Sequence, residues 1–344
     1  MNEEGDAPRP GGSDDGGAVD VEVPGALDGM RLDRAICLIS GASRADAARL
    51  IDSGEVSVAA QVATSRSRRV AAGEHLAFGP IPRIADEEPV ADAGVPFAVV
   101  WCDEHVIVVD KPAGVVVHPG AGVATGTLVN GLLARFEDLG RRASEGGMGP
   151  LQRPGIVHRL DKGTSGLLVV ARDPVAFQAL GEAVRGRRVD RDYLALVDGA
   201  VGTAAGLIDA PIARSARDAT RMAVSAAGRP SRTRYEVLRT WSAPQTGWEA
   251  VTELEAHLET GRTHQIRVHL AAIGHPIVGD DRYGRLRRPP GARGVRGLLG
   301  RPFLHAHRLG FDHPVTGVPL SFTSALPEDL VRVVDALGAP DGAT

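Results

Sequence analysis

One short stretch of the chain, HRLDKGTSG at residues 158–166, places a carboxylate among cations. Asp161 lies two residues after Arg159 and directly before Lys162, and two glycines and two hydroxyl side chains follow. Neighbouring positive charges favour the charged form of a carboxyl group, so Asp161 should be ionised. An ionised Asp can form a structural ion pair, accept a phosphoryl group, or act as a nucleophile or base. The stretch by itself leaves all of these roles open.

Several familiar chemistries fit the stretch poorly. The order of Thr and Gly in DKGTSG differs from the phosphorylation loop of cation-pumping ATPases, and no apolar run is long enough to span a membrane. No GxxxxGK run ends in Ser or Thr, as a phosphate-binding loop requires. A glycosidase needs a second positioned carboxylate, and the motif contains none. A metal site is not predicted, because His264 and His269 do not share a helix face and His305 and His307 lack nearby acidic ligands.

The bland interpretation of Asp161 is a structural ion pair, but the accompanying motifs favour a functional role. The run HRLDKGTSGLLVVAR at 158–172 resembles the signature of the RluA/RluD-type pseudouridine synthases. Five more motifs of that family follow the family's order in the chain. They are DKPAGVVVHP at 110–119, RDYLALVDG at 191–199, TGRTHQIRVH at 260–269, GHPIVGDDRYG at 274–284 and LHAHRLGFDHP at 304–314. The resemblance covers residues 95–330, which we expect to form the catalytic domain.

Members of this family convert uridine within RNA to pseudouridine. The uracil leaves its ribose at a ring nitrogen, turns and rejoins through carbon, so the resemblance implies no cofactor. It implies that Asp161 is the catalytic carboxylate, with attack on the sugar, deprotonation of the sugar and addition to the uracil ring all left open. It also implies that Tyr193 stacks on the flipped uracil, that Arg267 forms a salt bridge with Asp161, and that Arg159 contacts RNA. Leu160, between two cleft-facing side chains, should be buried.

An arginine-rich segment continues from the motif GHPIVGDDRYG at 274–284. Residues 282–301 carry seven arginines and no acid, and are too rich in Gly and Pro for a regular element. Asp280 and Tyr283 are expected to pin the loop that leads to it. A flexible basic loop that grips phosphates is one interpretation, and a solvated loop is the other. Its candidate RNA contacts are Arg285, Arg287 and Arg288.

The elements that must position these residues are mostly strands. Alternating or continuous apolar patterns predict strands in the segments 97–103, 105–112, 166–172, 191–199, 231–241 and 248–258. Helices are expected over 174–185 and 263–274, the second with Thr263 as its N-cap. Runs of neighbouring strands with a few helices predict an α+β fold, with a mixed, largely antiparallel sheet and flanking helices as in pseudouridine synthases.

A small N-terminal α/β domain is expected over residues 26–80. RLD at 31–33, SRADAARLIDSGEV at 43–56 and VAAGE at 70–74 resemble the alpha-L RNA-binding domain, although Ala59-Ala60 replaces the usual Asn-Gly turn. Two helices and three strands, EVSV, RRV and HLAF, are predicted. Its candidate RNA contacts are Arg44, Arg49 and Arg68.

The remaining segments and the composition complete the domain organisation. Residues 1–25 are acidic and rich in Gly and Pro, which predicts a disordered tail, 81–94 reads as a linker, and 331–344 as a C-terminal tail. The acids of the first tail account for the net charge of −4, so the rest of the chain is slightly basic. Two distant cysteines and no signal segment predict a cytoplasmic protein. We expect a monomer that binds neither metal nor membrane.

Together these observations predict an isomerase that modifies structured RNA. Ribosomal RNA of the large subunit is the expected substrate, and transfer RNA is the alternative. Two other classes compete with this interpretation. A non-catalytic RNA-binding or ribosome-assembly protein would not need the set of Asp161, Tyr193 and Arg267. An RNA glycosidase would need a second, water-activating acid near Asp161.

Overall fold

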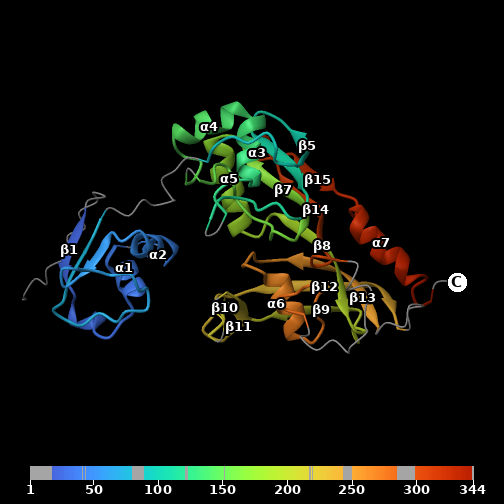
Figure 1. Ribbon diagram of the computed structural model, residues 1–344. Coiled ribbons are helices and arrows are strands. Elements are labelled where there is room, and N and C mark those ends of the chain that lie inside the picture. Colours follow the sequence, from blue (N-terminus) through green and yellow to red (C-terminus); the bar gives the residue numbers. More distant parts are fainter. Residues whose placement is uncertain are drawn as a thin grey trace, which may run out of the picture. The chain divides into compact units, whose positions relative to one another are not determined.

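The computed structural model describes residues 18–40, 42, 44–79, 89–120, 123–150, 152–216, 218, 220–242, 250–284 and 299–342. The chain divides into two compact units, Met1–Glu87 and Glu88–Thr344, which are described separately (Figure 1). In the part of the chain that the structure describes, no helix is both long and apolar enough to cross a membrane.

The first unit is a four-stranded antiparallel sheet with two helices. Its elements are β1 (Val19–Glu22), a 3-10 turn (Gly25–Leu27), α1 (Leu32–Ser40), α2 (Arg44–Asp52), β2 (Val56–Val58), β3 (Gln61–Val62) and β4 (His75–Phe78). The strand order is β1-β4-β2-β3. The sheet and helices share one apolar core, which includes Leu32, Ile36, Ile51, Val58 and Leu76.

Two expectations for this unit are wrong. Residues 19–22 belong to the sheet rather than to a tail, because their valines alternate with acids and β1 pairs with β4 from Val19↔Phe78 to Glu22↔His75. The segment RRV at 68–70 is not a strand and makes only an isolated bridge, Arg31↔Arg69. Residues 1–17, also expected in the tail, lie outside the described part.

The Ala59-Ala60 turn keeps the geometry that Asn-Gly usually provides. Both residues have left-handed backbone angles, with φ of 51° and 61°, and β2 and β3 pair across them. This backbone fits a tight hairpin turn. The left-handed conformation destabilises the fold by roughly 1 kcal/mol or more at each residue that carries a Cβ, so the departure from the family pattern costs stability but leaves the hairpin intact.

The second unit contains a nine-stranded mixed sheet. Its strand order is β5-β6-β7-β14-β8-β13-β12-β9, with β15 paired to β14. The bounds are β5 (Ala98–Cys102), β6 (Val106–Lys111), β7 (Ser165–Ala171), β8 (Asp190–Asp198), β9 (Ala205–Asp209), β12 (Arg232–Trp241), β13 (Val251–Leu258), β14 (Leu304–Asp312) and β15 (Pro319–Thr323). The pair β7–β14 is parallel and the other described pairs are antiparallel. A hairpin of β10 (Ile212–Arg214) and β11 (Met222–Val224) stands apart. The predicted fold class is confirmed.

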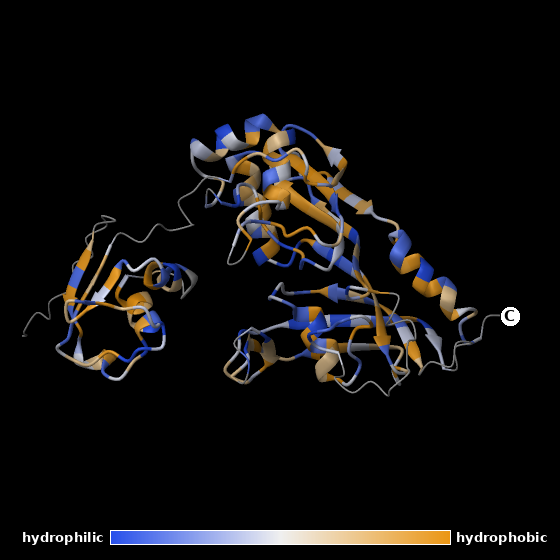
Figure 2. Cartoon of the chain, viewed as in Figure 1, coloured by the Kyte–Doolittle hydropathy of each residue, from blue (hydrophilic) through white to orange (hydrophobic). Residues whose placement is uncertain are grey.

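Five helices flank this sheet. They are α3 (Leu128–Arg135), α4 (Glu137–Ser144), α5 (Pro174–Arg185), α6 (Gln265–Ala272) and α7 (Glu328–Leu337). In Figure 1, α3, α4 and α5 lie at the β5–β7 end, and α6 lies beside β12 and the β10–β11 hairpin. Figure 2 shows the hydrophobic colour concentrated on the central strands, and the seven residues of β7 are all buried.

Two further expectations are corrected in this unit. Helix α6 begins at Gln265 and not at a Thr263 cap, because His264 adopts a left-handed φ of 58° and the Gln265 side chain accepts the N–H of Arg262. The C-terminal segment is not a tail. Helix α7 buries Leu330 and Val333 in the main core, and the indole N–H of Trp241 donates to the carbonyl of Gly338 just beyond the helix.

Candidate active site

Asp161 lies on a tight turn immediately before β7. The turn is closed by a hydrogen bond from the N–H of Thr164 to the carbonyl of Asp161, 3.1 Å long. Gly166 has a φ of 112°, and a Cβ there would lie 2.2 Å from the carbonyl oxygen of Ala306. Only glycine therefore lets β7 approach β14 so closely behind the turn. The sequence GTSG thus serves to place Asp161 at the end of a buried strand.

Arg301 holds the same turn from the side of the C-terminal helix. Its Nη1 donates to the carbonyl of Gly163 and to Oγ of Ser165, each at 3.2 Å. Its Nε and Nη2 donate to Asp329 of α7 at 2.6 and 2.9 Å. The fork of one guanidinium therefore ties the turn that carries Asp161 to α7, which explains why α7 belongs to the domain.

Arg267 on α6 is the direct partner of Asp161, as the family resemblance implies. Its Nη1 lies 3.2 Å from Oδ2 of Asp161, while Nε and Nη2 donate to the two carboxylate oxygens of Asp280 at 2.6 and 2.9 Å. Burial raises the pKa of the Asp280 carboxyl, but the hydrogen bond and charge of Arg267, together with the backbone N–H groups of Tyr283 and Arg282, hold that pKa below its usual range. The bidentate pair with Asp280 fixes the guanidinium plane and aims the remaining nitrogen at Asp161.

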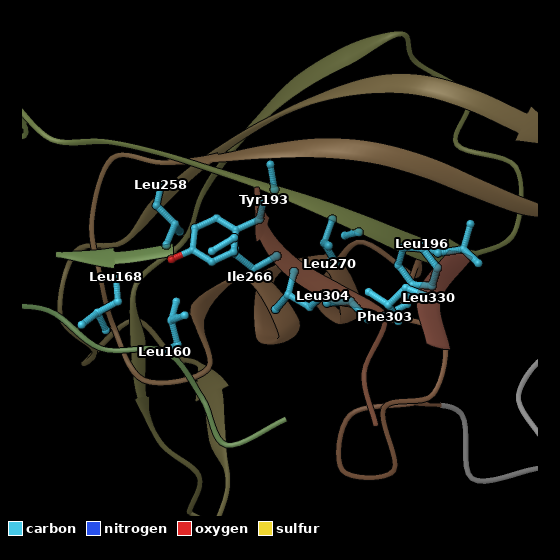
Figure 3. Close-up of a cluster of buried hydrophobic side chains, with 14 of the residues drawn as sticks. Leu160, Leu168, Tyr193, Leu196, Leu258, Ile266, Leu270, Phe303, Leu304 and Leu330 are labelled. Atoms are coloured by element: carbon cyan, nitrogen blue, oxygen red, sulfur yellow. The ribbon is translucent and has the colours of Figure 1, made fainter. Parts of the chain in front are cut away.

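Tyr193 on β8 provides the apolar wall next to this pair. Only 4 % of the residue is exposed, and Figure 3 shows its ring among Leu160, Leu258 and Ile266. Burial raises the pKa of the Tyr193 hydroxyl to about 12, so the phenol is neutral at physiological pH. Tyr193, Asp161 and Arg267 line one small cavity of about 40 Å³. A flat, neutral, partly enclosed ring beside a carboxylate suits the stacking of a planar base.

A larger cleft of about 470 Å³ opens over Asp161 and Tyr193 and is strongly basic. Seven arginines line it against two carboxylates, Asp161 and Glu259. The arginines are Arg153, Arg159, Arg185, Arg187, Arg191, Arg229 and Arg262. Within the described residues, only Arg187 among them pairs with an acid inside 4.0 Å, and that acid is Glu259. Such an excess of unneutralised positive charge fits the phosphate backbone of a nucleic acid.

Lys111 is buried behind the turn that carries Asp161. No part of it is exposed, and its Nζ donates to the carbonyls of Pro112 and Val115 at 2.8 and 2.9 Å. Burial lowers the pKa of this ammonium to about 7, although the nearby charge of Asp161 acts in the opposite direction. The side chain is therefore held so that it changes charge near neutral pH.

The low pKa of Lys111 predicts how stability changes with pH. Above pH 7 the native Lys111 is largely neutral while the unfolded side chain, with a pKa near 10.5, is still protonated. The unfolded state then binds one more proton, so raising the pH favours the folded state. Between pH 7 and 9 the unfolding free energy of the wild type should rise by about 2 kcal/mol relative to Lys111→Met.

Urea unfolding followed by tryptophan fluorescence measures this difference, since all three tryptophans belong to the second unit. Lys162→Met is the matched control, because Lys162 is the only other lysine in the chain and is exposed. Its stability should follow the wild type over the same pH range. Parallel pH curves for the wild type and Lys111→Met would contradict the prediction.

The geometry agrees with comparisons to known proteins. A family model for RNA pseudouridylate synthase matches residues 105–272. A ribosomal large subunit pseudouridine synthase D of Nitrosomonas europaea is 40% identical over 96% of this chain and 91% of its own. The corresponding protein of Pseudomonas aeruginosa is 41% identical over 92% of this chain and 95% of its own. The chain belongs to the RNA pseudouridine synthase family.

Two solved pseudouridine synthase domains share its fold. Human RNA pseudouridylate synthase domain containing 1 matches 75% of this chain and 100% of its own with a TM-score of 0.51 and 26% identity. Human RNA pseudouridylate synthase domain containing 4 matches 70% of this chain and 92% of its own with a TM-score of 0.52 and 25% identity. As a pseudouridine synthase, the chain is an isomerase, as the sequence motifs predict.

The structure of this pseudouridine synthase brings the principal predicted residues together. Asp161, Tyr193 and Arg159 line the basic cleft, and Arg267 lies beside them in the smaller cavity. Leu160 is 3 % exposed, as expected from its place between two cleft-facing side chains.

The predicted peripheral RNA contacts are less distinctive. Arg49 pairs with Asp46 at 2.5 Å and Arg68 with Glu74 at 3.4 Å, so each carries a neutralised charge. The side chain of Arg44 and the segment containing Arg285, Arg287 and Arg288 lie outside the described residues. The sequence does not predict the other six cleft arginines as site residues, although Arg191 and Arg262 lie inside the motifs RDYLALVDG and TGRTHQIRVH. Their position within those motifs was the available signal.

Proposed function

We propose that this chain converts uridines of large-subunit ribosomal RNA to pseudouridine in the cytoplasm, as a monomer, with Asp161 as the catalytic carboxylate and no cofactor. The observation that carries the proposal is the ion pair of Asp161 and Arg267 beside a cleft in which, among the described residues, six of the seven arginines have no acid within 4.0 Å. Support for the substrate comes from the names of relatives that match this chain over at least nine-tenths of its length.

The reaction asks little of the protein beyond one carboxylate and exclusion of water. The uracil leaves the ribose at nitrogen and returns through carbon, so the leaving group is also the nucleophile and no atom is lost. Asp161 attacks the sugar carbon or removes a sugar proton, and Arg267 orients its carboxylate for either step. The enclosed ring of Tyr193 stacks on the detached base and keeps out water that would intercept the intermediate.

The RNA must present its uridine outside a helix stack for this chemistry. Arg159 is exposed at the mouth of the cleft, where it contacts the RNA next to the extruded base. The N-terminal unit serves as a separate RNA-binding module that adds affinity and does not take part in the chemistry. Structured rRNA with accessible loops supplies such a target.

Mapping of pseudouridine in cellular RNA tests the proposed function. RNA from a strain that lacks the gene is compared with RNA from the same strain carrying the gene or its Asp161→Asn variant. Carbodiimide modification with primer extension should show specific large-subunit rRNA positions that are modified only with the intact gene. Loss of sites in transfer RNA alone would move the substrate to transfer RNA, and unchanged pseudouridine in every RNA would overturn the enzymatic role.

A further inference from the structure

Arg191 differs from the other arginines of the basic cleft in being buried. Only 5 % of the residue is exposed, whereas Arg153, Arg159 and Arg185 are exposed to solvent. Water can stabilise an exposed guanidinium, but a buried one needs a counter-charge or a full set of hydrogen bonds. The burial of Arg191 therefore requires an explanation that the exposed arginines do not.

The described residues provide no such counter-charge. No carboxylate lies within 4.0 Å of Arg191, and its one hydrogen bond runs from Nη2 to the carbonyl of Leu258 at 3.3 Å. The Nε atom is buried without a partner. The neighbouring Asp192 points to the opposite face of β8, where it binds His257 and Arg308. A permanent cation is thus held in the cleft wall with donors to spare.

A second buried donor without a partner lines the same cleft. The Nε2 atom of His158 accepts the N–H of Val169, so its Nδ1 carries the proton and has no acceptor among the described residues. Burial lowers the pKa of His158 to about 3, and the positive charge of Arg191 adds to this effect, so the ring is neutral and the two side chains lie near each other. Two spare donors on one wall favour an anion over a metal ion or an apolar ligand.

The position of Arg191 relative to Tyr193 suggests which anion. The two residues are two apart on β8, so their side chains share a face and are about 7 Å apart along the strand. A nucleotide whose base lies on Tyr193 carries a phosphate on each side of its ribose. The Nη1 atom of Arg191 lies over Gly261, where a Cβ would come within 3.0 Å of it, so this glycine leaves the guanidinium room at the cleft.

We propose that Arg191, assisted by His158, binds the RNA phosphate adjacent to the target uridine. The site rests on the proposed function in one respect, that the cleft holds RNA, but not on which RNA is modified. Arg191 then supplies part of the energy that holds the extruded nucleotide, and the phosphate supplies the counter-charge that the folded protein lacks. Arg191 contacts the backbone and takes no part in bond making.

Salt-dependent binding tests the phosphate contact without reference to the natural substrate. The full-length protein is titrated with a fluorescein-labelled 12-nucleotide oligouridylate between 50 and 300 mM KCl. Arg191→Gln keeps an amide donor for the Leu258 carbonyl but removes the charge. It should weaken binding about tenfold and reduce the slope of log K against log salt by about 0.7, the value for one phosphate contact on a single strand.

Matched variants separate charge from structure. Arg191→Lys should retain the wild-type slope, and Arg332→Gln should as well, because Arg332 is an exposed residue of α7 paired with Glu328. Should Arg191→Gln fail to fold, Gly261→Ala provides the test, since its Cβ crowds Nη1 while the charge remains. That variant should bind several-fold more weakly with a reduced slope.

A neutral linkage locates the phosphate. In an RNA that the enzyme modifies, each phosphate flanking the uridine is replaced in turn by methylphosphonate. One replacement should weaken wild-type binding about tenfold and have little further effect on Arg191→Gln. A folded Arg191→Gln protein with an unchanged salt slope would overturn the proposal. So would a loss of affinity on methylphosphonate replacement that is as large in Arg191→Gln as in the wild type at every linkage. Failure of rRNA as the substrate leaves the oligouridylate result unaffected, so the two proposals fail separately.

Discussion

Replacing Asp161 with Asn should abolish pseudouridine formation while leaving RNA binding in place. In the proposed mechanism the carboxylate attacks or deprotonates the sugar, and an amide has neither the charge nor the basicity for either step. We expect the single-turnover rate to fall by at least ~10⁴-fold, as for loss of a nucleophile in other enzymes. The dissociation constant for RNA should change by less than about threefold or decrease, since the substitution removes a negative charge from a basic cleft.

Glu259→Gln is the matched control, because Glu259 is the other carboxylate of the cleft. It is tied to Arg234 at 2.5 Å and Arg232 at 2.9 Å, and the hydrogen bond from Arg234 holds its pKa below the usual range. A carboxylate so paired is a poor general base, so the rate should fall less than ~10-fold. An equal loss of rate in both variants, together with release of free uracil by the wild-type enzyme, would instead indicate the two-carboxylate chemistry of a glycosidase.

Six strands of the catalytic domain, β5 to β8, β12 and β13, are predictable because their apolar patterns are local, whereas β9, β10, β11, β14 and β15 are not predicted. β7 is buried throughout and is apolar after its first residue, Ser165, and β8 and β13 follow the segments expected from their patterns. The errors arise where tertiary contacts decide. From sequence alone the valines of β1 belong to an acidic tail, and only their pairing with β4 makes them a strand. The segment of α7 likewise resembles a tail in sequence, but it packs against the main core and is joined to Trp241 by a hydrogen bond. The predicted N-cap of α6, Thr263, is wrong because the side chain of Gln265 closes the preceding loop by accepting the N–H of Arg262.

In the site, too, some features are predictable from sequence motifs and others depend on the tertiary structure. Asp161, Tyr193 and Arg267 stand in motifs whose order along the chain is characteristic, so their convergence could be predicted from a resemblance. The second ion pair of Arg267, with Asp280, could not be predicted, because its hydrogen bonds depend on the angle at which α6 meets the loop after it. The burial of Arg191 is equally invisible in the sequence, since RDY gives no sign of which of its charges faces a core.

The second large effect is expected for Arg267→Lys, which keeps the charge but loses the planar fork. Lys can reach either Asp161 or Asp280 but cannot hold both, and the side chain of Asp280 has no exposed surface with which to recruit water. A carboxylate turned by about 1 Å from its productive position costs on the order of 10²-fold in rate. We therefore expect kcat to fall ~10²-fold and the unfolding free energy to fall by about 3 kcal/mol, because a buried pair is left incomplete.

The kinetic pattern distinguishes orientation of Asp161 from a contact with RNA. Arg267 is 8 % exposed and each of its nitrogens already donates to a carboxylate, so the dissociation constant for RNA should change by less than about threefold. Asp280→Asn should reproduce the loss of kcat, because it weakens the fork that aims Arg267 without touching the cleft. Arg267→Met should be worse than Arg267→Lys. A variant of Arg267 that keeps kcat and loses affinity would show that the guanidinium serves the RNA, and the orienting role would then belong to another group.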